Sequence, residues 1–354
     1  MRESKIIVDL SAVKYNYNKI KEYVNNKEVM PVIKAFGYGS FINTRVNFLN
    51  NFKIVGVALV EEGVFLRKLG YKNDIFILNQ PFKSEVDLII KYNLIVGVSS
   101  LEFLEYIKNK KIKIHLELET GMNRTGLNVN DIFKFINLIK KSNILLEGVY
   151  SHFSSADTNY DYTLKQFNIF KECVDIIKNY FNLKYIHISA SSGILTLKED
   201  YTNLVRVGLL LYGYYPNKKC QNIIDIKPSI KFISKISFIK QVEKDEFISY
   251  NQTYKTNRKS IIATVPVGYA DGINMLLSNK GFVYINNKKC RIIGKICMDS
   301  LLVDVNDIDC KIDDEVVIFD NDNIKIDEIC NITNLSIYNI LSCISVRIDR
   351  EFID

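Results

Sequence analysis

A lysine follows the first apolar run of the chain that has the character of a buried strand. Residues 30–33 read Met-Pro-Val-Ile, and Lys34 comes next, before Ala-Phe-Gly-Tyr-Gly at 35–39. An ammonium group is costly to remove from water, so a lysine at the end of such a strand needs either a carboxylate partner or a chemical use. A desolvated amine is suited to forming a Schiff base with a carbonyl compound. The position therefore leaves both an ion-paired lysine and a Schiff-base lysine open.

Other polar groups follow later apolar runs in the same manner. They are Glu117 and Arg124, His152, Ser191, and Arg206 with Gly208 and Leu209. The glycines on either side of Tyr38 favour a tight turn that presents N–H groups and a phenol to an anion, and Ser191 with the amides of residues 208 and 209 offers similar donors. Together these groups favour a phosphate-bearing ligand that also supplies a carbonyl for the lysine. Pyridoxal 5′-phosphate fits this description.

The elements that position these groups recur with a regular spacing. Eight β-branched runs cover residues 30–33, 54–59, 75–78, 95–98, 112–118, 145–150, 185–188 and 204–211. Helix-compatible stretches such as 60–69, 101–108, 131–141 and 162–180 lie between them. This alternation is typical of a parallel sheet covered by helices, and eight repeats suit a (β/α)₈ TIM barrel, in which reactive groups lie at the carboxyl ends of the strands. A doubly wound sheet is the alternative, but no G-x-G-x-x-G follows the first strand.

The pattern changes after residue 225. Strand-like runs at 230–239, 246–250, 261–267, 281–285, 291–296, 301–305 and 314–319 are joined by short polar turns, and the next helix-like stretch is 325–336. We therefore predict a barrel domain at 1–225 and a mostly-β C-terminal domain at 226–354. Residues 5–10 precede the first helix and are expected to add a strand to the β domain.

Composition narrows the class of protein. The chain has 354 residues, 47% hydrophobic and 25% charged, which is typical of a globular protein. No apolar run reaches the ~18 residues that a membrane span needs, and the N-terminal segment has no signal-peptide core, so a cytoplasmic location is expected. The net charge of +7 is scattered, which argues against nucleic acid as a partner. Seven cysteines without a C-x-x-C pair argue against a disulfide framework, and no metal site is predicted.

The motifs that carry these residues resemble those of one family. PVIKAFGYG resembles the cofactor-lysine motif of alanine racemases, which are fold-type III pyridoxal-phosphate enzymes. Seven further stretches resemble that family's other signatures in the same order, namely ETGMNRTG, SHFSSAD, VRVGLLLYG, FISYNQTY, VPVGYADG, GKICMDS and IYNILSCISVRIDR. The resemblance implies interconversion of L- and D-alanine for peptidoglycan synthesis. It also implies a homodimer whose two composite sites each take β-domain residues from the other subunit.

The resemblance also implies a role for each site residue. Lys34 would hold the cofactor and act as one base, and Tyr250 of the other subunit would act as the second; two bases on opposite faces exchange the α-proton without turning the substrate over. Arg206 would face the pyridine nitrogen, with His152 in the same hydrogen-bond chain. The remaining implied residues are Tyr38, Ser191, Gly208, Leu209 and Tyr338 at the phosphate, Arg124 and the backbone of Met298 at the substrate carboxylate, Tyr269 at the entrance, and Cys297 and Asp299 in support.

Several positions depart from the family pattern. Phe36 and Ala190 stand where Asn is common, Ser40-Phe41 replace His-Gly, Asn251 follows Tyr250 where Gly is usual, and Lys295 replaces an entrance Arg. None of these changes removes a catalytic group, although they alter the polarity of the pocket and its entrance.

Glu117 is the departure with the most direct physical consequence. In many relatives a carbamylated lysine at this position supplies a carboxylate that fixes the substrate-binding arginine. Glu117 supplies a negative charge directly, seven residues before Arg124, and this predicts a charge-assisted hydrogen bond between the two side chains. The alternative is that Glu117 is only a polar strand residue.

Other functions remain open at this point. A serine or broad-specificity racemase would differ at Tyr338 and at the entrance residues. A non-catalytic pyridoxal-phosphate barrel protein would have no use for residues 226–354, and a decarboxylase of the same two-domain form would need an acidic residue where Arg206 stands. A metal-dependent barrel hydrolase is disfavoured by the supply of only three histidines with no H-x-H pair.

Overall fold

The computed structural model describes residues 3–354, which form two compact units. The barrel unit comprises Lys14–Gly37 and Ile42–Lys227. The β unit comprises the segment up to Val13, the short segment Tyr38–Phe41, and Pro228–Asp354. The chain passes from the barrel unit to the large C-terminal part of the β unit between Lys227 and Pro228.

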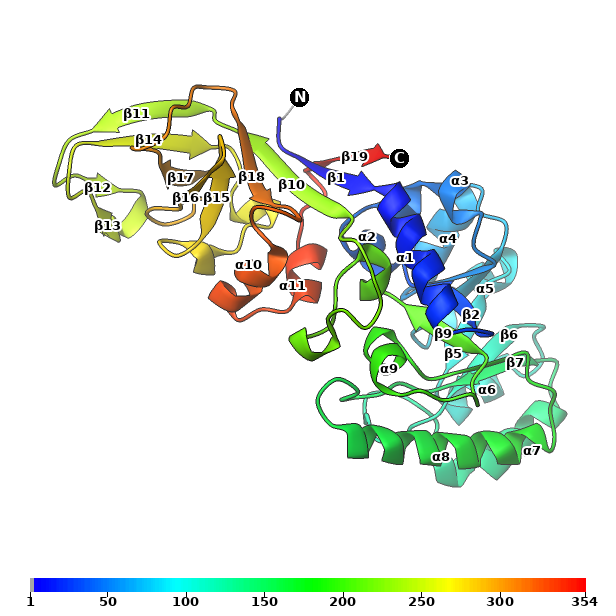
Figure 1. Ribbon diagram of the computed structural model, residues 1–354. Helices are drawn as coiled ribbons and strands as arrows, with labels where there is room; N and C mark the ends of the chain where they lie inside the picture. The colour runs from blue at the N-terminus through cyan, green and yellow to red at the C-terminus, as the bar shows by residue number, and fades with distance from the viewer. Residues whose placement is uncertain (1–2) are drawn as a thin grey trace. The chain divides into compact units, whose positions relative to one another are not determined.

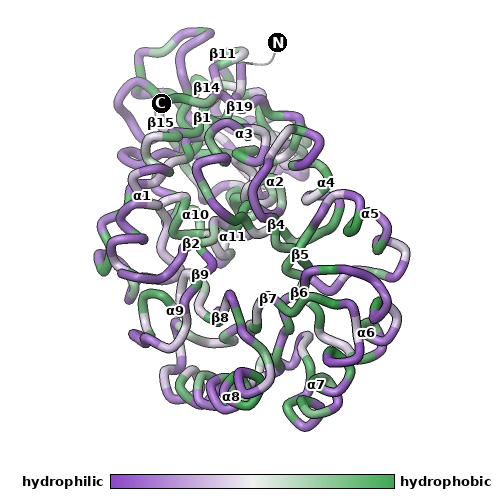
Figure 2. The backbone as a smooth tube through the Cα atoms, turned by 90° about the vertical axis from the view of Figure 1, so that its right-hand side faces the viewer, coloured by the Kyte–Doolittle hydropathy of each residue, from purple (hydrophilic) through white to green (hydrophobic). Residues whose placement is uncertain are grey.

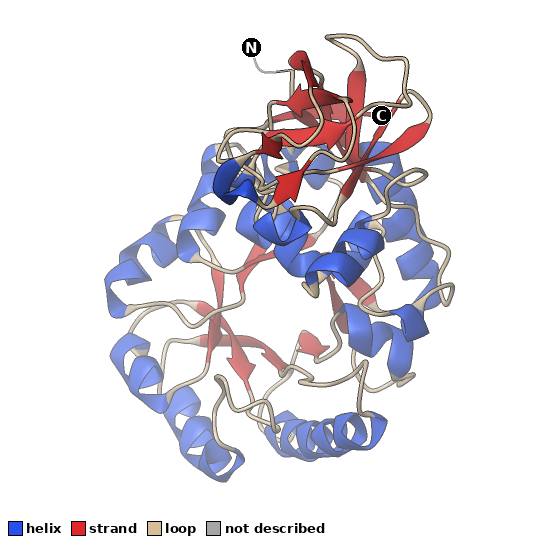
Figure 3. Cartoon of the chain, turned by 90° about the vertical axis from the view of Figure 1, so that its left-hand side faces the viewer, coloured by secondary structure: helices blue, strands red, loops and turns tan. Residues whose placement is uncertain are grey.

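Eight parallel strands form the centre of the barrel unit. They are β2 (Glu28–Pro31), β3 (Ile54–Val57), β4 (Asp74–Ile77), β5 (Ile95–Val98), β6 (Lys113–Glu117), β7 (Leu145–Tyr150), β8 (Tyr185–His187) and β9 (Leu204–Val207). Strands β3 to β8 pair in chain order, and β2 pairs with β9. Ile33 N–H donates to Gly56 O over 2.8 Å, which joins β2 to β3, and Arg206 N–H donates to Ser189 O over 3.1 Å, which joins β9 to the end of β8. The ring of strands is therefore continuous, and the predicted barrel is confirmed (Figure 3).

Helices cover the outside of this ring (Figure 3). They are α1 (Leu10–Tyr23), the short α3 (Val46–Leu49), then α4 (Val60–Lys68), α5 (Val86–Lys91), α6 (Leu101–Ile107), α7 (Ile132–Lys140), α8 (Tyr160–Lys178) and α9 (Ser191–Thr196). The segment labelled α2 (Lys34–Tyr38) is a left-handed turn, because Ala35, Phe36 and Gly37 have positive φ angles. In α7 the buried residues Ile132, Phe135, Ile136 and Ile139 follow the spacing of one helical face. Figure 2 shows the apolar character of β4 and β5, which these helices cover. Within residues 3–354, none of the helices has both the length and the apolar character that crossing a membrane requires.

The β unit contains two main sheets (Figure 1). The larger has the order β16 (Lys288–Arg291), β15 (Phe282–Ile285), β18 (Glu315–Phe319), β10 (Ile230–Lys235), β1 (Lys5–Asp9) and β19 (Asp349–Ile353), and the smaller has the order β11 (Phe238–Val242), β14 (Ser260–Val265) and β17 (Leu301–Asp304). A two-stranded ladder joins β12 (Phe247–Ile248) to β13 (Tyr254–Lys255). Strand β1 runs antiparallel to β10 and parallel to β19, so the N-terminal strand is an integral part of this sheet.

Two predicted strands of the β unit differ from the structure. The run 230–239 divides into β10 and β11, which lie in different sheets, so the chain changes sheet between Lys235 and Phe238. The run 291–296 ends as a strand at Arg291, because Gly294 has a φ of 71° and interrupts extended pairing. The predicted helix at 325–336 is present as α10 (Ile326–Thr333), and α11 (Ile337–Ser342) follows it.

Candidate active site

Lys34 lies directly after β2, at the carboxyl end of the barrel strands. Val32 forms a β-bridge to Gly56, and Ile33 N–H bonds the carbonyl of that same glycine, so the backbone is held to β3 up to the residue before the lysine. The Lys34 side chain is partly buried. Within the described part of the chain, its amine makes no hydrogen bond or ion pair. The amine is therefore held at the barrel mouth without a carboxylate partner.

The residues after Lys34 form a left-handed turn. The φ angles of Ala35, Phe36 and Gly37 are 51°, 53° and 63°, and Tyr38 and Gly39 continue with 56° and 77°. Left-handed geometry costs an L-residue about 1–2 kcal/mol, whereas glycine adopts it freely. Strained residues of this kind persist only where surrounding contacts hold them, and they cluster at functional sites.

The charges around Lys34 favour the neutral amine. Burial lowers the pKa of Lys34, and the guanidinium groups of Arg124 and Arg206 lower it further, whereas Glu62 acts in the opposite direction. A lysine with a lowered pKa has a larger fraction of free amine near neutral pH, and the free amine is the nucleophile.

A chain of polar side chains runs from the barrel mouth into the barrel interior. The NH1 group of Arg206 lies 2.7 Å from His187 Nδ1, and its NH2 group lies 3.0 Å from His152 Nδ1. His187 Nε2 in turn lies 2.8 Å from His115 Nδ1. All three histidines of this chain are thus connected to one buried guanidinium.

This arrangement fixes the tautomers of the histidines. A guanidinium can only donate, so Nδ1 of His187 and Nδ1 of His152 must both accept, and each ring carries its proton on Nε2. His187 then donates from Nε2 to Nδ1 of His115. Burial is the main cause that lowers the pKa of His115 and of His152 to about 3, and it places the pKa of His187 well below its usual value. All three rings are therefore neutral at physiological pH.

Arg206 retains one donor that these partners do not use. Besides the two histidine nitrogens, NH1 and NH2 donate to the carbonyls of His187, Ser151 and Ile188 at 3.3, 2.7 and 2.9 Å. The Nε–H group has no acceptor among residues 3–354. Burial lowers the pKa of Arg206 to about 10, so the group remains a cation near neutral pH.

An aromatic stack supports the polar chain from one side. The ring of Tyr150 lies 5.1 Å from that of His187 with an interplanar angle of 8°, and the guanidinium carbon of Arg206 lies 5.5 Å from the centre of the Tyr150 ring. The Tyr150 hydroxyl donates to Leu78 O over 2.8 Å. Gly97 leaves room for it, because a Cβ there would lie 2.3 Å from the Tyr150 hydroxyl oxygen.

Ser191, Gly208 and Leu209 lie together near the ends of the last two strands. Ser191 begins α9, and its hydroxyl accepts from Leu210 N–H over 3.4 Å. In the described residues, the N–H groups of Gly208 and Leu209 donate to no other group. These three residues thus offer a hydroxyl and two free amides to an anion.

In the β unit, Tyr250 lies on an irregular turn and its side chain is 65% exposed. Ser249 before it has a φ of 65°, and its hydroxyl donates to Lys295 O over 2.5 Å and lies 3.6 Å from Cys297 Sγ. Asn251, which stands where the motif usually has glycine, has a φ of 62°. Asparagine tolerates this region better than most residues, so the substitution keeps the turn geometry.

The segments that carry Tyr269 and Met298 are bonded to each other. Tyr269 N–H donates to Cys297 O, and Ala270 N–H donates to Met298 O, both over 3.0 Å. A Cβ on Gly268 would lie 2.3 Å from Cys297 O, so only glycine allows this approach.

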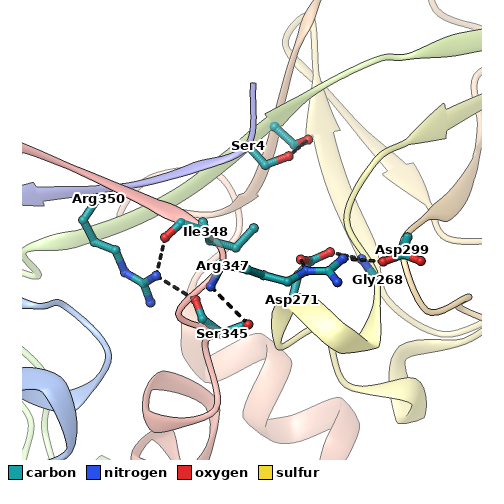
Figure 4. A network of polar contacts seen from close by, with 9 residues as sticks. Ser4, Gly268, Asp271, Asp299, Ser345, Arg347, Ile348 and Arg350 are labelled. Carbon is teal, nitrogen blue, oxygen red and sulfur yellow. Dashed lines mark hydrogen bonds and ion pairs between the residues drawn. The ribbon is translucent and has the colours of Figure 1, made fainter. Parts of the chain in front are cut away.

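The buried carboxylate of Asp271 connects the segment of Tyr269 to that of Met298 through Arg347 (Figure 4). Asp271 is fully buried, accepts from Gly268 N–H over 2.8 Å, and receives Arg347 Nε over 2.7 Å. Arg347 also pairs with Asp299, one residue after Met298. Arg347 therefore ties the two segments together.

Tyr38 and Tyr338 are neighbours in the β unit. Their ring centres are 6.2 Å apart, and burial raises the pKa of Tyr38 well above its usual value, so its hydroxyl stays a donor at all relevant pH values. Arg350 holds the backbone after Tyr38, because its Nε and NH2 groups donate to Gly39 O over 3.1 and 3.0 Å.

Comparisons with known proteins agree with this geometry. The chain matches the alanine racemase N-terminal domain over residues 8–216 and the alanine racemase C-terminal domain over residues 229–352. The chain belongs to the alanine racemase family. The alanine racemase of Fusobacterium nucleatum is 40% identical over 345 residues, covering 92% of this chain and 94% of that protein. Alanine racemase 1 of Clostridium acetobutylicum is 35% identical over 98% of this chain and 94% of that protein. The solved structure of Clostridium difficile alanine racemase has a TM-score of 0.94 and 32% identity, covering 99% of this chain and 96% of that one.

The structure of this alanine racemase family member groups the predicted site residues within each unit. In the barrel unit, Lys34, His152 and Arg206 are close enough to interact electrostatically. Arg206 lowers the pKa of both Lys34 and His152, and Lys34 lowers that of His152 as well. Ser191, Gly208 and Leu209 form a second group at the ends of the last strands. In the β unit, Tyr269, Cys297, Met298 and Asp299 form a third group, and Tyr38 with Tyr338 a fourth.

The predicted hydrogen bond between Glu117 and Arg124 is wrong. Glu117 is buried and accepts from Ser99 Oγ over 2.6 Å, and no hydrogen bond or ion pair joins it to Arg124 within residues 3–354. The loop that carries Arg124 explains this result: Leu127 N–H donates back to Glu117 O over 2.7 Å, so the segment folds back on itself and leaves Arg124 exposed. Burial is the main cause that raises the pKa of Tyr150, and the Glu117 carboxylate raises it further.

Sequence reasoning missed five residues of this family member's site. They are Glu62, His115, Tyr150, His187 and Arg347. His115 and His187 lie on strands, and the available signal was that the chain has only three histidines, so that two on barrel strands and one at a strand end were candidates for a shared site. The positions of Glu62 and Arg347 in the sequence give no indication that these residues belong to the site.

Proposed function

We propose that the chain is an alanine racemase that uses pyridoxal 5′-phosphate to interconvert L- and D-alanine. The observation that carries this proposal is the combination, at one barrel mouth, of an amine without a carboxylate partner and a buried guanidinium with a free Nε–H. The alanine racemase name of its relatives, which match this chain over nearly its whole length, supports the choice of alanine.

The residues present fit the cofactor. Lys34 has the lowered pKa suited to a carbonyl group, and Arg206 Nε–H is an unused donor for a ring nitrogen. The hydroxyl of Ser191 and the amides of Gly208 and Leu209 suit a phosphate, with Tyr38 and Tyr338 added by the family resemblance. When bound, pyridoxal 5′-phosphate withdraws electrons from the α-carbon of the attached amino acid and makes its α-proton acidic.

The chain's own residues would then move the proton. Lys34 Nζ takes or gives the α-proton on one face, and the Tyr250 hydroxyl of a second copy does so on the other. His152 presents Nε2–H, since its Nδ1 is occupied by Arg206, and this donor stabilises a phenolate. Arg124, exposed and without a carboxylate partner in the described residues, is available for the substrate carboxylate together with Met298 N–H.

The active unit in this proposal is a homodimer with composite sites. Tyr250, the proposed second base, is 65% exposed on the single chain, and Met298 and Tyr269, proposed for the substrate carboxylate and the entrance, are 52% and 42% exposed. A second copy that covered them would complete both sites. The cytoplasmic location expected from the sequence stays a prediction.

The test is a racemase assay on the purified protein with L-alanine and D-alanine, with serine as the competing substrate. We expect interconversion of alanine, an absorbance band near that of a protonated Schiff base, and borohydride trapping of the cofactor on the peptide that contains Lys34. Lys34→Ala should abolish both the band and the activity. An adduct on another lysine, or faster turnover of serine than of alanine, would contradict the assignment.

A further inference from the structure

Glu62 holds the turn that begins at Lys34 through three backbone hydrogen bonds. One oxygen, Oε1, accepts from Ala35 N–H over 2.6 Å. The other, Oε2, accepts from Ala58 N–H over 2.7 Å and from Leu59 N–H over 3.1 Å. One carboxylate therefore connects the residue after Lys34 to the segment between β3 and α4.

The Ala35 N–H group needs such an acceptor. Pairing with β3 ends at Ile33, whose N–H donates to Gly56 O, and the left-handed turn then carries the chain away from the strand. Within this turn, Gly37 N–H donates to Ile33 O over 3.0 Å, but Ala35 N–H has no backbone acceptor in the described residues. Backbone donors left without a partner are rare in folded proteins, so the side chain of Glu62 takes the place of a ladder bond.

Among residues 3–354, the same carboxylate is the anion that acts on Lys34. Arg124 and Arg206 act on the lysine as cations, and Glu62 opposes them. The arginines favour loss of the lysine proton, and Glu62 limits this effect. The position of Glu62 thus bears on both the geometry and the charge of the amine.

We propose that Glu62 is a positioning residue that fixes the strained turn after Lys34 and so aims the lysine amine at the barrel mouth. This inference rests on the proposed function of Lys34 as the cofactor-binding amine. It assigns Glu62 no contact with substrate or cofactor, because its oxygens are occupied by the three backbone donors.

The test uses Glu62→Gln, with Glu61→Gln as the matched control. Glutamine keeps the size of the side chain but has one oxygen, so it cannot accept at both ends of the contact, and its amide group opposes an N–H donor. Glu61 is the neighbouring residue in the first turn of α4, is exposed, and makes no hydrogen bond or ion pair in the described residues. Both variants remove one negative charge, so they differ in the loss of at least one end of the contact that Glu62 makes and in distance from Lys34.

The first measurement is hydrogen exchange of the peptide that contains Ala35. Glu62→Gln should increase the exchange rate of this amide by about tenfold or more, the change expected when a hydrogen bond to a charged group is lost. Glu61→Gln should leave it within twofold of the unmodified protein. Equal protection in both variants would overturn the proposal.

The second measurement follows the reactivity of Lys34 in cofactor-free protein, by labelling with trinitrobenzenesulfonate across a pH series and quantifying the Lys34 peptide. In Glu62→Gln the labelling midpoint should move to lower pH, because the opposing anion is gone. At a pH where the amine is neutral in both proteins, the rate at which added pyridoxal 5′-phosphate is trapped by borohydride should fall about tenfold, because the turn no longer aims the amine. An unchanged midpoint and trapping rate would overturn the proposal. If Glu62→Gln does not fold, Glu62→Asp is used, since its shorter side chain keeps the charge but cannot span both ends.

These measurements separate this inference from the proposed function. If the unmodified protein traps no cofactor on Lys34, the proposed function fails, while hydrogen exchange and apo-protein labelling still decide whether Glu62 holds the turn. If trapping occurs normally and Glu62→Gln changes neither exchange nor labelling, the proposed function stands and the role of Glu62 is refuted.

Discussion

Gly97→Ala is predicted to destabilise the barrel through one side chain, Tyr150. The added Cβ would lie 2.3 Å from the Tyr150 hydroxyl oxygen and 2.9 Å from Leu78 O, and these two oxygens are hydrogen-bonded to each other. Overpacking costs about 1–3 kcal/mol and loss of the hydrogen bond about 1 kcal/mol. Alanine has less conformational entropy than glycine in the unfolded state, and this difference offsets about 0.5–1 kcal/mol of the loss in stability. The net loss should be about 2–3 kcal/mol.

A double-mutant cycle with Tyr150→Phe isolates the cause. Removing the hydroxyl removes the closest contact and the hydrogen bond, whereas the added Cβ would still lie 2.9 Å from Leu78 O. Gly97→Ala should therefore cost less in that background, by a coupling free energy of about 1–2 kcal/mol. Urea unfolding followed by circular dichroism measures all four proteins. Strictly additive costs would refute the reasoning, because they would mean that the alanine does not displace the Tyr150 hydroxyl. Displacement of Tyr150 should also reduce racemase activity, since its ring stacks on His187 and lies beside Arg206.

Two further predictions concern charged and titratable groups. Burial keeps the three histidines neutral in the folded state, whereas the unfolded chain takes up protons below a histidine pKa of ~6.5. The contribution of the three histidines to stability is therefore present above pH ~6.5 and is lost as the pH falls toward 3. Between pH 6.5 and 5.5 the free energy of unfolding should fall by on the order of 3 kcal/mol. Urea unfolding against pH measures this slope, and His115→Gln should lower it by about a third, whereas an unchanged slope would show that His115 does not contribute. Arg347→Met should lower the free energy of unfolding, because it removes the ion pair between Arg347 and the buried Asp271 carboxylate, although the partial exposure of Arg347 reduces the effect. Hydrogen exchange should increase at residues 268–272 in Arg347→Met but not in Arg258→Met, whose ion pair with Asp307 is exposed on both sides; equal exchange in both variants would contradict the role given to Arg347.

The alternation of apolar runs and amphipathic stretches was sufficient to predict the barrel, because parallel strands that are buried on both faces are mostly apolar. The predicted strands failed where backbone conformation overrode side-chain character. Residues 292–296 are mostly apolar, yet Gly294 at φ 71° directs the chain away from β16. Residues 236–237 separate two strands that read as one, because nothing in the composition marks a change of sheet.

The site was harder to predict than the fold, because its contacts join residues from different elements. The spacing of seven residues between Glu117 and Arg124 suggested a contact, but the loop that carries Arg124 contains Gly121 and Gly126 at φ 131° and 124° and folds back on the strand. Glu62 is one of two adjacent glutamates at the start of a helix, and only the three-dimensional structure distinguishes the one whose carboxylate reaches Ala35.

The surroundings of Arg206 indicate why a buried cation is retained without an anion. A buried guanidinium is costly when no carboxylate pairs with it, and none does so within residues 3–354. Its acceptors are three carbonyls and two imidazole nitrogens, all neutral, so the positive charge is positioned without being cancelled. A carboxylate at residue 187 would lower the cost of burial, but it would also neutralise the charge that the free Nε–H presents at the barrel mouth. Histidine provides the hydrogen bond without that loss, because burial and then the neighbouring guanidinium keep the ring from taking up a second proton.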